Sequence, residues 1–196
     1  YKKFFAELDD AIDVLTPLAS AGATLMQDYD NVYDGSVKNW VKFANTLRLR
    51  LAIRVAYADA ALAKTEAEKS INNVIGVIEA VDEHAELLHS KLNYYHPNYD
   101  MQETFNAGEI RMSAAMDSYM NGYNDPRRTA YFKTAADDGG YHGVRCGTGN
   151  ISSKVSAYAG AKISKLNIDK TTTPIVWMTA AESYFLRAEG ALRGWN

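Results

Sequence analysis

The chain has 196 residues, of which 47% are hydrophobic and 23% charged, and its 21 basic and 24 acidic residues give a net charge of −3. These proportions are those of a globular chain long enough to bury a core, and they exclude a disordered polymer. No basic run supports nucleic-acid binding. The single cysteine, Cys146, excludes an internal disulfide framework.

Apolar residues at helical spacing predict five helices, at approximately residues 3–15, 36–57, 65–81, 109–120 and 175–193. Pro17 is expected to end the first helix. Ser36, which follows an Asp34-Gly35 turn, is expected to cap the second. Pro174 stands just before the last helix, a position that proline favours.

Long irregular segments are predicted between these helices. Residues 86–108 lack helical periodicity and are rich in Tyr, Asn, His and Pro, and residues 131–172 are polar and rich in glycine. Such long stretches inside compact domains are uncommon and often functional. The sequence therefore predicts a mainly α fold with long irregular loops, in a single domain over residues 1–196. Antiparallel helix pairs of this length are typical of tetratricopeptide-like hairpins.

Charged residues occupy the apolar faces of two predicted helices. Arg54 falls about 20° from Leu47 on the second helix. Glu182 and Glu189 lie close to the apolar face of the last helix. Because a buried charge is costly unless it is paired, we expect Arg54 or its neighbour Arg50 to pair with one of these glutamates across packed helices. The apolar face of the last helix is expected to consist of Met178, Phe185 and Leu192.

Catalysis is the alternative role for the two glutamates. Their spacing on one helix corresponds to about 10.5 Å along the axis, which exceeds the roughly 5–9.5 Å between the carboxylates of glycoside hydrolases. The sequence contains no nucleophile elbow, phosphate-binding loop or dinucleotide fingerprint. We therefore favour structural ion pairing and assign no catalytic residue and no cofactor.

A calcium site in the segment before the second helix is the one metal alternative. Asp28, Asp30 and Asp34 alternate there as in a calcium-binding loop. However, Gly35 stands at the eighth position instead of the sixth, and Asn39 stands at the twelfth, where a bidentate glutamate is needed. The sequence thus excludes a regular EF-hand and leaves a looser calcium site at the three aspartates.

One segment connects the chain to a known family. YDGSVKNWVKFANTLRLRLAIR, residues 33–54, resembles the YGGD-x-x-KW-x-KFAN-x-LKLRLA-x-R signature of SusD/RagB proteins. KKFFAELDDAIDVL, NDPRRTAYF and PIVWMTAAESYFLRAEGALRGW resemble further parts of that family in the same order. The departures are small, since Asp34-Gly35-Ser36 replaces Gly-Gly-Asp and no lipidated cysteine is present.

The resemblance implies a SusD-like helical scaffold without enzymatic activity. Proteins of this family are outer-membrane, cell-surface lipoproteins of Gram-negative bacteria that capture glycans for a SusC-like TonB-dependent transporter. The expected partners are therefore that transporter and a glycan, with a membrane contact only through a lipid anchor outside this sequence. We expect the chain to be an internal fragment that lacks the signal and lipidation region and a C-terminal part.

The irregular loops are the expected place for ligand contacts. A sugar combines flat C–H patches with hydroxyl groups, so aromatic faces with neighbouring amides suit it. The alternative for these tyrosines is that they pack the loops onto the scaffold. The alternative function is a helical protein-interaction scaffold, or a peptide-capturing family member without sugar binding. The expected ligand contacts are Tyr94, Tyr95, Tyr99, Asn98 and Tyr141.

Overall fold

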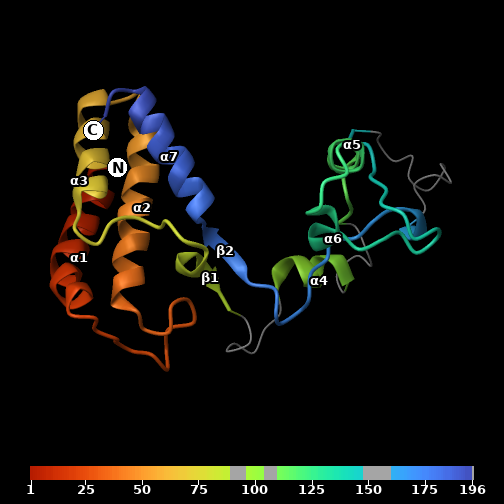
Figure 1. The fold of residues 1–196 in the computed structure, drawn as a ribbon, viewed down its shortest axis with the longest axis horizontal. Coiled ribbons are helices and arrows are strands. Elements are labelled where there is room, and N and C mark those ends of the chain that lie inside the picture. Colours follow the sequence, from red (N-terminus) through yellow and green to blue (C-terminus); the bar gives the residue numbers. More distant parts are fainter. Residues whose placement is uncertain (89–95, 104–109, 148–159, 196) are drawn as a thin grey trace. The chain divides into compact units, whose positions relative to one another are not determined.

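A computed structural model describes residues 1–88, 96–103, 110–147 and 160–195. It is mainly α-helical, as the sequence predicts. The chain divides into two compact units: unit 1 comprises Tyr1–Leu88 and Pro174–Asn196, and unit 2 comprises His89–Thr173 (Figure 1). The expected single domain over residues 1–196 thus comprises two units, which are described separately below.

Unit 1 is organised around one central helix. In its described part, four α-helices pack together: α1 (Lys2–Ser20), α2 (Val37–Val55), α3 (Ala60–Asn72) and α7 (Ala180–Leu192). Helix α2 contacts each of the other three, and Figure 1 shows it between α1 and α3 on one side and α7 on the other. The cap predicted at Ser36 is confirmed, because its hydroxyl accepts a hydrogen bond from the Asn39 amide.

The prediction that Pro17 ends the first helix is wrong. Helix α1 continues through Pro17 to Ser20. A proline inside a helix removes one backbone hydrogen bond, but the last turn is held by packing, because Ala19 is buried in a cluster with Ile12, Val37 and Val41. The chain leaves the helix at Gly22, whose positive φ of 72° suits glycine.

The third predicted helix is shifted. Helix α3 begins after Asp59, whose carboxylate caps the Leu62 amide, and it ends before Asn73. The segment that follows is irregular, and it is held by polar groups of α2: Asn45 donates to the Gly76 carbonyl, and the Thr46 hydroxyl accepts from the Ile78 amide. Ile78 is therefore fully buried without being helical.

The last predicted helix begins with a strand. Residues Ile175–Met178 form β2, which pairs antiparallel with β1 (Ala85–Leu87). Strand β1 follows the short 3-10 helix η1 (Val81–Glu83) in the chain. β-Branched and aromatic side chains such as Ile175, Val176 and Trp177 favour this conformation. Thr179 then caps α7, because its hydroxyl accepts a hydrogen bond from the Glu182 amide.

The inward face of α7 also differs from the prediction. Phe185 and Leu192, expected on a buried stripe, are 78% and 88% exposed. The helix instead buries the small residues Ala180, Ser183 and Gly190. Small side chains permit close packing of this helix in unit 1, and they leave its largest apolar groups on the surface of the described chain.

Buried cations on α2 tie the helices together. Arg48 is 3% exposed, and its guanidinium pairs with Asp9 of α1 and lies 3.6 Å from Glu66 of α3. Lys69 bridges the same two carboxylates from the surface. Lys42, which is 8% exposed, pairs with Glu83 of η1. The apolar periodicity of α2 did not predict pairing of Arg48 or Lys42.

Unit 2 has short helices and mostly irregular backbone. Its described elements are α4 (Pro97–Glu103), α5 (Ala114–Gly122), α6 (Arg128–Tyr131) and the 3-10 helix η4 (Gly160–Lys162). Helix α5 is shorter than predicted because Ser113 caps it, and α4 lies where only loop was expected. Met112, Met120 and Phe132 form the small core. Gln102, fully buried, hydrogen-bonds both backbone groups of Leu166.

The network around Arg48 makes a direct prediction for stability. Arg48→Ala removes the buried partner of Glu66 and leaves it the surface cation Lys69, so the free energy of unfolding should fall by about 3 kcal/mol, the lower end for a broken buried pair. Arg54→Ala is the matched control, since Arg54 lies on the same helix but is exposed, and it should change stability by less than about 0.5 kcal/mol. Urea denaturation of the full-length protein measures both, and equal effects of the two substitutions would refute the role given to Arg48.

Candidate functional site

The predicted ion pair between α2 and α7 is present as Arg50 with Glu182. Arg50 Nε lies 2.6 Å from Glu182 Oε1, and Nη2 lies 2.7 Å from Oε2. Arg50 also donates to the Trp177 carbonyl at 3.0 Å. Glu189 pairs instead with Arg193 of its own chain segment, and Arg54 is exposed. With both carboxylates held by guanidinium groups, the geometry fits a structural role for the two glutamates better than a catalytic one.

The predicted ligand contacts are distributed unevenly over the structure. Tyr94 and Tyr95 lie outside the described residues. Asn98 and Tyr99 lie on α4, where Asn98 is exposed and Tyr99 is half-buried. Their amides bond the ring nitrogen and the carbonyl of His96, which is buried. The structure therefore places Asn98 at a surface and fixes the start of its helix.

Tyr141 packs onto the core of unit 2. Its ring joins the cluster of Met112, Met120 and Phe132, and the guanidinium of Arg128 lies 4.7 Å from the ring centroid. The face under Arg128 is thus covered and is not available for stacking on a sugar. Tyr141 therefore packs its loop onto the core of unit 2, as the alternative to ligand contact proposed for the loop tyrosines.

The residues after Tyr141 line a polar cavity of about 410 Å³, together with Asp137 and Lys162. Its acidic residues Asp117 and Asp138 have partners within unit 2. Asp138 accepts from the Gly140 amide and contacts the His142 ring at 2.9 Å, and these two interactions hold the pKa of Asp138 below its ordinary value. Within the described ranges, no group of three or more Asp, Glu, His or Cys residues is placed to hold a metal ion.

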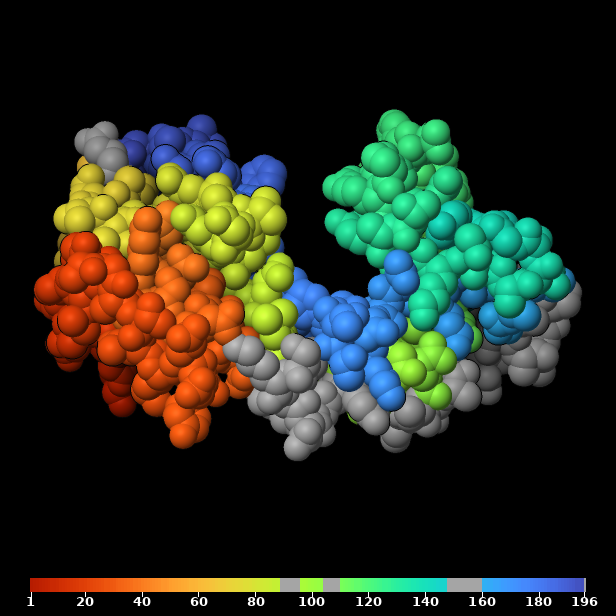
Figure 2. Space-filling view, turned by 60° about the horizontal axis from the view of Figure 1, so that its bottom comes forward, coloured from red at the N-terminus to blue at the C-terminus, as the bar shows by residue number. Residues whose placement is uncertain are grey.

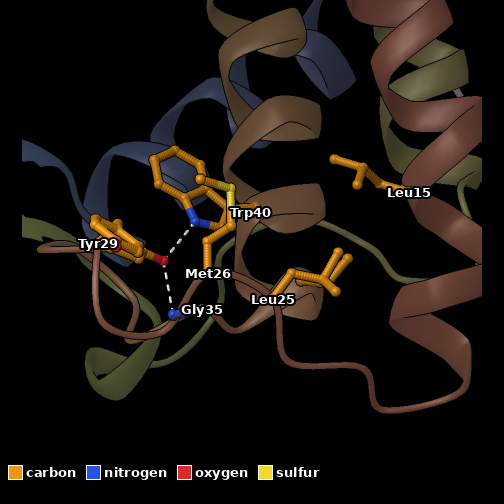
Figure 3. A pocket seen from close by; sticks show the side chains of 8 residues that line it. Leu15, Leu25, Met26, Tyr29, Gly35 and Trp40 are labelled. Carbon is orange, nitrogen blue, oxygen red and sulfur yellow. Dashed lines mark hydrogen bonds between the residues drawn. The ribbon is translucent and has the colours of Figure 1, made fainter.

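An apolar pocket of about 370 Å³ opens between α1 and the start of α2 in unit 1. Figure 3 shows Met26 reaching toward the indole of Trp40, with Leu15 and Leu25 on the other side. The segment between the two helices, orange in Figure 2, lies on the surface of unit 1. Met26 and Tyr29 are 74% and 80% exposed. The lining residues are Leu15, Leu25, Met26, Tyr29, Asp30, Gly35, Val37 and Trp40.

Asp30 fixes the wall of this pocket. Its carboxylate accepts hydrogen bonds from the amides of Val32, Tyr33 and Gly35 and from the Trp40 indole nitrogen at 2.7 Å, two of which Figure 3 draws as dashed lines. Burial by itself would raise the pKa of Asp30, but these four donors outweigh it and hold the pKa below its ordinary value of 3.8.

The structure does not bring the three candidate calcium ligands together. Asp28, Asp30 and Asp34 all belong to the described residues, and they do not form a group that could hold a metal ion. The physical reason is that Asp30 uses its oxygens as acceptors for the turn itself. Gly35 completes that turn at a φ of 81°, where a Cβ would lie 2.4 Å from the Leu25 carbonyl oxygen.

The pocket offers apolar contacts and few polar ones. Because the Asp30 carboxylate and the Trp40 indole nitrogen bond each other, the lining can contact an apolar group but has little to offer a hydroxyl-rich ligand. No pattern used to predict the site pointed to this pocket. Its signal was the row of apolar residues Leu25, Met26 and Tyr29 in an otherwise polar turn.

Comparison with known proteins identifies the family. The family described as "SusD-like: Susd and RagB outer membrane lipoprotein" matches residues 1–196. A chitin-binding SusD homolog from Flavobacterium johnsoniae is 41% identical with a TM-score of 0.83, and the match covers 100% of this chain and 40% of that one. A SusD homolog from Bacteroides uniformis ATCC 8492 is 38% identical with a TM-score of 0.79, covering 97% of this chain and 38% of that one.

The chain therefore belongs to the SusD-like family. It spans about 40% of the length of the solved relatives that it matches. No curated protein matches it. In the part of the chain that the structure describes, none of the helices has the length and apolar character required to cross a bilayer. The recognition made from residues 33–54 is confirmed.

The Asp30 turn predicts a pH-dependent contribution to stability. Asp30→Ala leaves three amides and an indole without their acceptor and should lower the free energy of unfolding by about 1–3 kcal/mol. Since the folded pKa is lowered, this contribution is fully present above the unfolded pKa of about 3.9 and is lost as the pH falls through the folded value.

Thermal unfolding at several pH values provides the measurement. The difference between wild type and Asp30→Ala should be constant above about pH 5 and should shrink below about pH 4. Asp28→Ala, an exposed aspartate of the same turn, is the control and should leave stability unchanged. A difference that grows on acidification would contradict the account.

Proposed function

We propose that this protein binds a glycan at the surface of the outer membrane and delivers it to a SusC-like TonB-dependent transporter. The observation that carries the proposal is membership of the SusD-like family, with a chitin-binding homolog 41% identical over the whole of this chain. A further relative of 27% identity is also described as a chitin-binding protein. The protein is held at the membrane by a lipid anchor and performs no catalysis on the glycan.

The chemistry of a glycan favours exposed aromatic groups with polar neighbours. Stacking on a tyrosine face and hydrogen bonds to amides bind C–H patches and hydroxyls together. Tyr94, Tyr95, Tyr99 and Asn98 remain the proposed contacts from the sequence. A single shallow site of this kind has an affinity near the millimolar range, about −4 kcal/mol, and repeated engagement of a polysaccharide raises the overall affinity.

The test is binding of the full-length protein to a panel of soluble polysaccharides that includes solubilised chitin. Affinity electrophoresis should show retardation by at least one glycan, and calorimetry should give its Kd. Tyr94→Ala and Tyr95→Ala should weaken that binding without changing thermal stability. The proposal fails when no glycan of the panel retards the wild-type protein, and release of shorter oligosaccharides on incubation would refute the absence of catalysis.

A protein-interaction scaffold is the second candidate function, and the apolar pocket next to Trp40 favours it. Its exposed side chains Leu25, Met26 and Tyr29 suit an apolar side chain of a partner protein better than a sugar, since the polar groups nearby already bond each other. We propose that the pocket receives such a side chain from the transporter. This role and glycan binding are compatible, because they use different residues.

Substitutions in the pocket separate the two functions. Leu25→Asp and Met26→Asp place a charge in an apolar contact, and they should abolish co-purification with the transporter while leaving glycan binding intact. Val14→Asp is the control, because Val14 is an exposed apolar residue of α1 that does not line the pocket. Equal co-purification of all three variants would exclude the pocket as a docking site.

A further inference from the structure

Helix α5 carries an apolar stripe of which only part enters the core. Met116, Tyr119, Met120 and Tyr123 follow the spacing of one helix face. Met120 is 4% exposed and belongs to the core of unit 2, whereas Tyr119 and Tyr123 are 68% and 80% exposed. Figure 2 shows α5 and the turn after it, in green, protruding from unit 2. Two large aromatic groups, Tyr119 on the helix and Tyr123 directly after it, therefore lie outside the core.

The two tyrosines form one surface. Their ring centroids are 5.9 Å apart, and their planes are inclined by 34°. They line a cavity of about 390 Å³ with Met116, Asp125 and Arg127. A cavity of this size with a mostly aromatic and apolar lining and a few polar groups is typical of small-ligand sites.

The surface is held in place before any ligand binds. Ser113 caps α5 by accepting the Met116 amide, and Asp117 accepts the Gly143 amide from a neighbouring loop. At the other end, the Asp125 amide bonds the Met120 carbonyl after the chain turns at Asn124, whose φ is 48°. Because this backbone is already ordered, binding a ligand would not carry the entropic cost of ordering it, and this favours affinity.

A charged pair stands at the rim. Asp125 accepts hydrogen bonds from the Arg127 amide at 2.9 Å and from Nη2 of the same residue at 2.6 Å. The Arg127 side chain and amide lower the pKa of Asp125 to about 2, so both groups are ionised at neutral pH and their charges cancel. The guanidinium has more N–H donors than this carboxylate uses, and these suit hydroxyl oxygens.

We propose that Tyr119 and Tyr123 stack against a neutral hexopyranose residue of the bound glycan, and that Asp125 and Arg127 hydrogen-bond its hydroxyl groups. The inference rests on the proposed glycan binding and adds a site that the sequence candidates do not include. The cancelled charge at the rim favours a neutral sugar over a uronic acid or a sulfated one. The aromatic pair suits the C–H face of a pyranose ring.

The test is calorimetry of the full-length protein with the glycan that the panel identifies, starting with the hexamer of N-acetylglucosamine as the probe. Tyr119→Ala and Tyr123→Ala should each raise the Kd by about tenfold. Tyr123→Trp should retain or strengthen binding, because it keeps a larger aromatic face. Tyr57→Ala is the matched control: Tyr57 is 92% exposed, lies in unit 1 and should leave the Kd unchanged.

The outcomes separate this inference from the proposed function. Loss of binding in the two alanine variants, with thermal midpoints and Tyr57→Ala unchanged, supports the site. Unchanged Kd values in both alanine variants overturn the site and leave glycan binding standing. A wild-type protein that binds no glycan of the panel overturns both. Tighter binding of a uronic acid polymer than of neutral glycans overturns the assigned sugar class.

Discussion

The buried guanidinium of Arg48 is the constraint on which unit 1 depends. It sits on the central helix α2 and must satisfy its charge against Asp9 of α1 and Glu66 of α3, which fixes those two helices at once. Two further cations of α2 extend the same arrangement, because Lys42 pairs with η1 and Arg50 with α7. Hydrophobic contact is non-directional, whereas each of these ion pairs sets a donor on α2 against a carboxylate on another element.

In a scaffold held in this way, many charged groups on the helices are paired with one another. Glu182 and Glu189 bond arginines, so these two carboxylates are engaged in holding the fold. The surfaces suited to recognition are elsewhere: an apolar pocket beside Trp40 in unit 1 and an aromatic pair on α5 in unit 2. This separation of support from recognition is consistent with the relatives of the chain. They share its fold, although more than half of the matched residues differ.

The sequence predicted those features whose cause is local. The Ser36 cap and the central helix depend on a few adjacent residues, and the family signature lies on the same segment. The predictions failed where tertiary contacts compete with periodicity. Ile175 and Val176 belong to a strand because β1 is there to pair with them, and Ile78 is buried in irregular backbone because Thr46 holds its amide.

The sequence could predict the residue types of a candidate binding site but not which individual residues are exposed. Tyrosines with polar neighbours were the residues sought, but only an exposed ring can stack on a ligand. The exposure of a side chain depends on tertiary contacts that the sequence pattern does not reveal. Tyr141 is half-buried beneath Arg128. Tyr119 and Tyr123 have the spacing of an apolar helix face, but their side chains are largely exposed to solvent. The partner of Arg50 was found among four combinations. Arg48 was missed because, at 100° per residue, it lies about 100° from Leu47 and so falls outside the predicted apolar face.

Hydrogen exchange of the full-length protein, with and without a saturating oligosaccharide, tests the separation of scaffold and recognition most directly. The account predicts that amides of α2 exchange slowest and are unaffected by the ligand, while amides between Ser113 and Arg127 become protected on binding. Protection confined to α2 and the start of α7 around Arg50 and Glu182, with no change on α5, would contradict it.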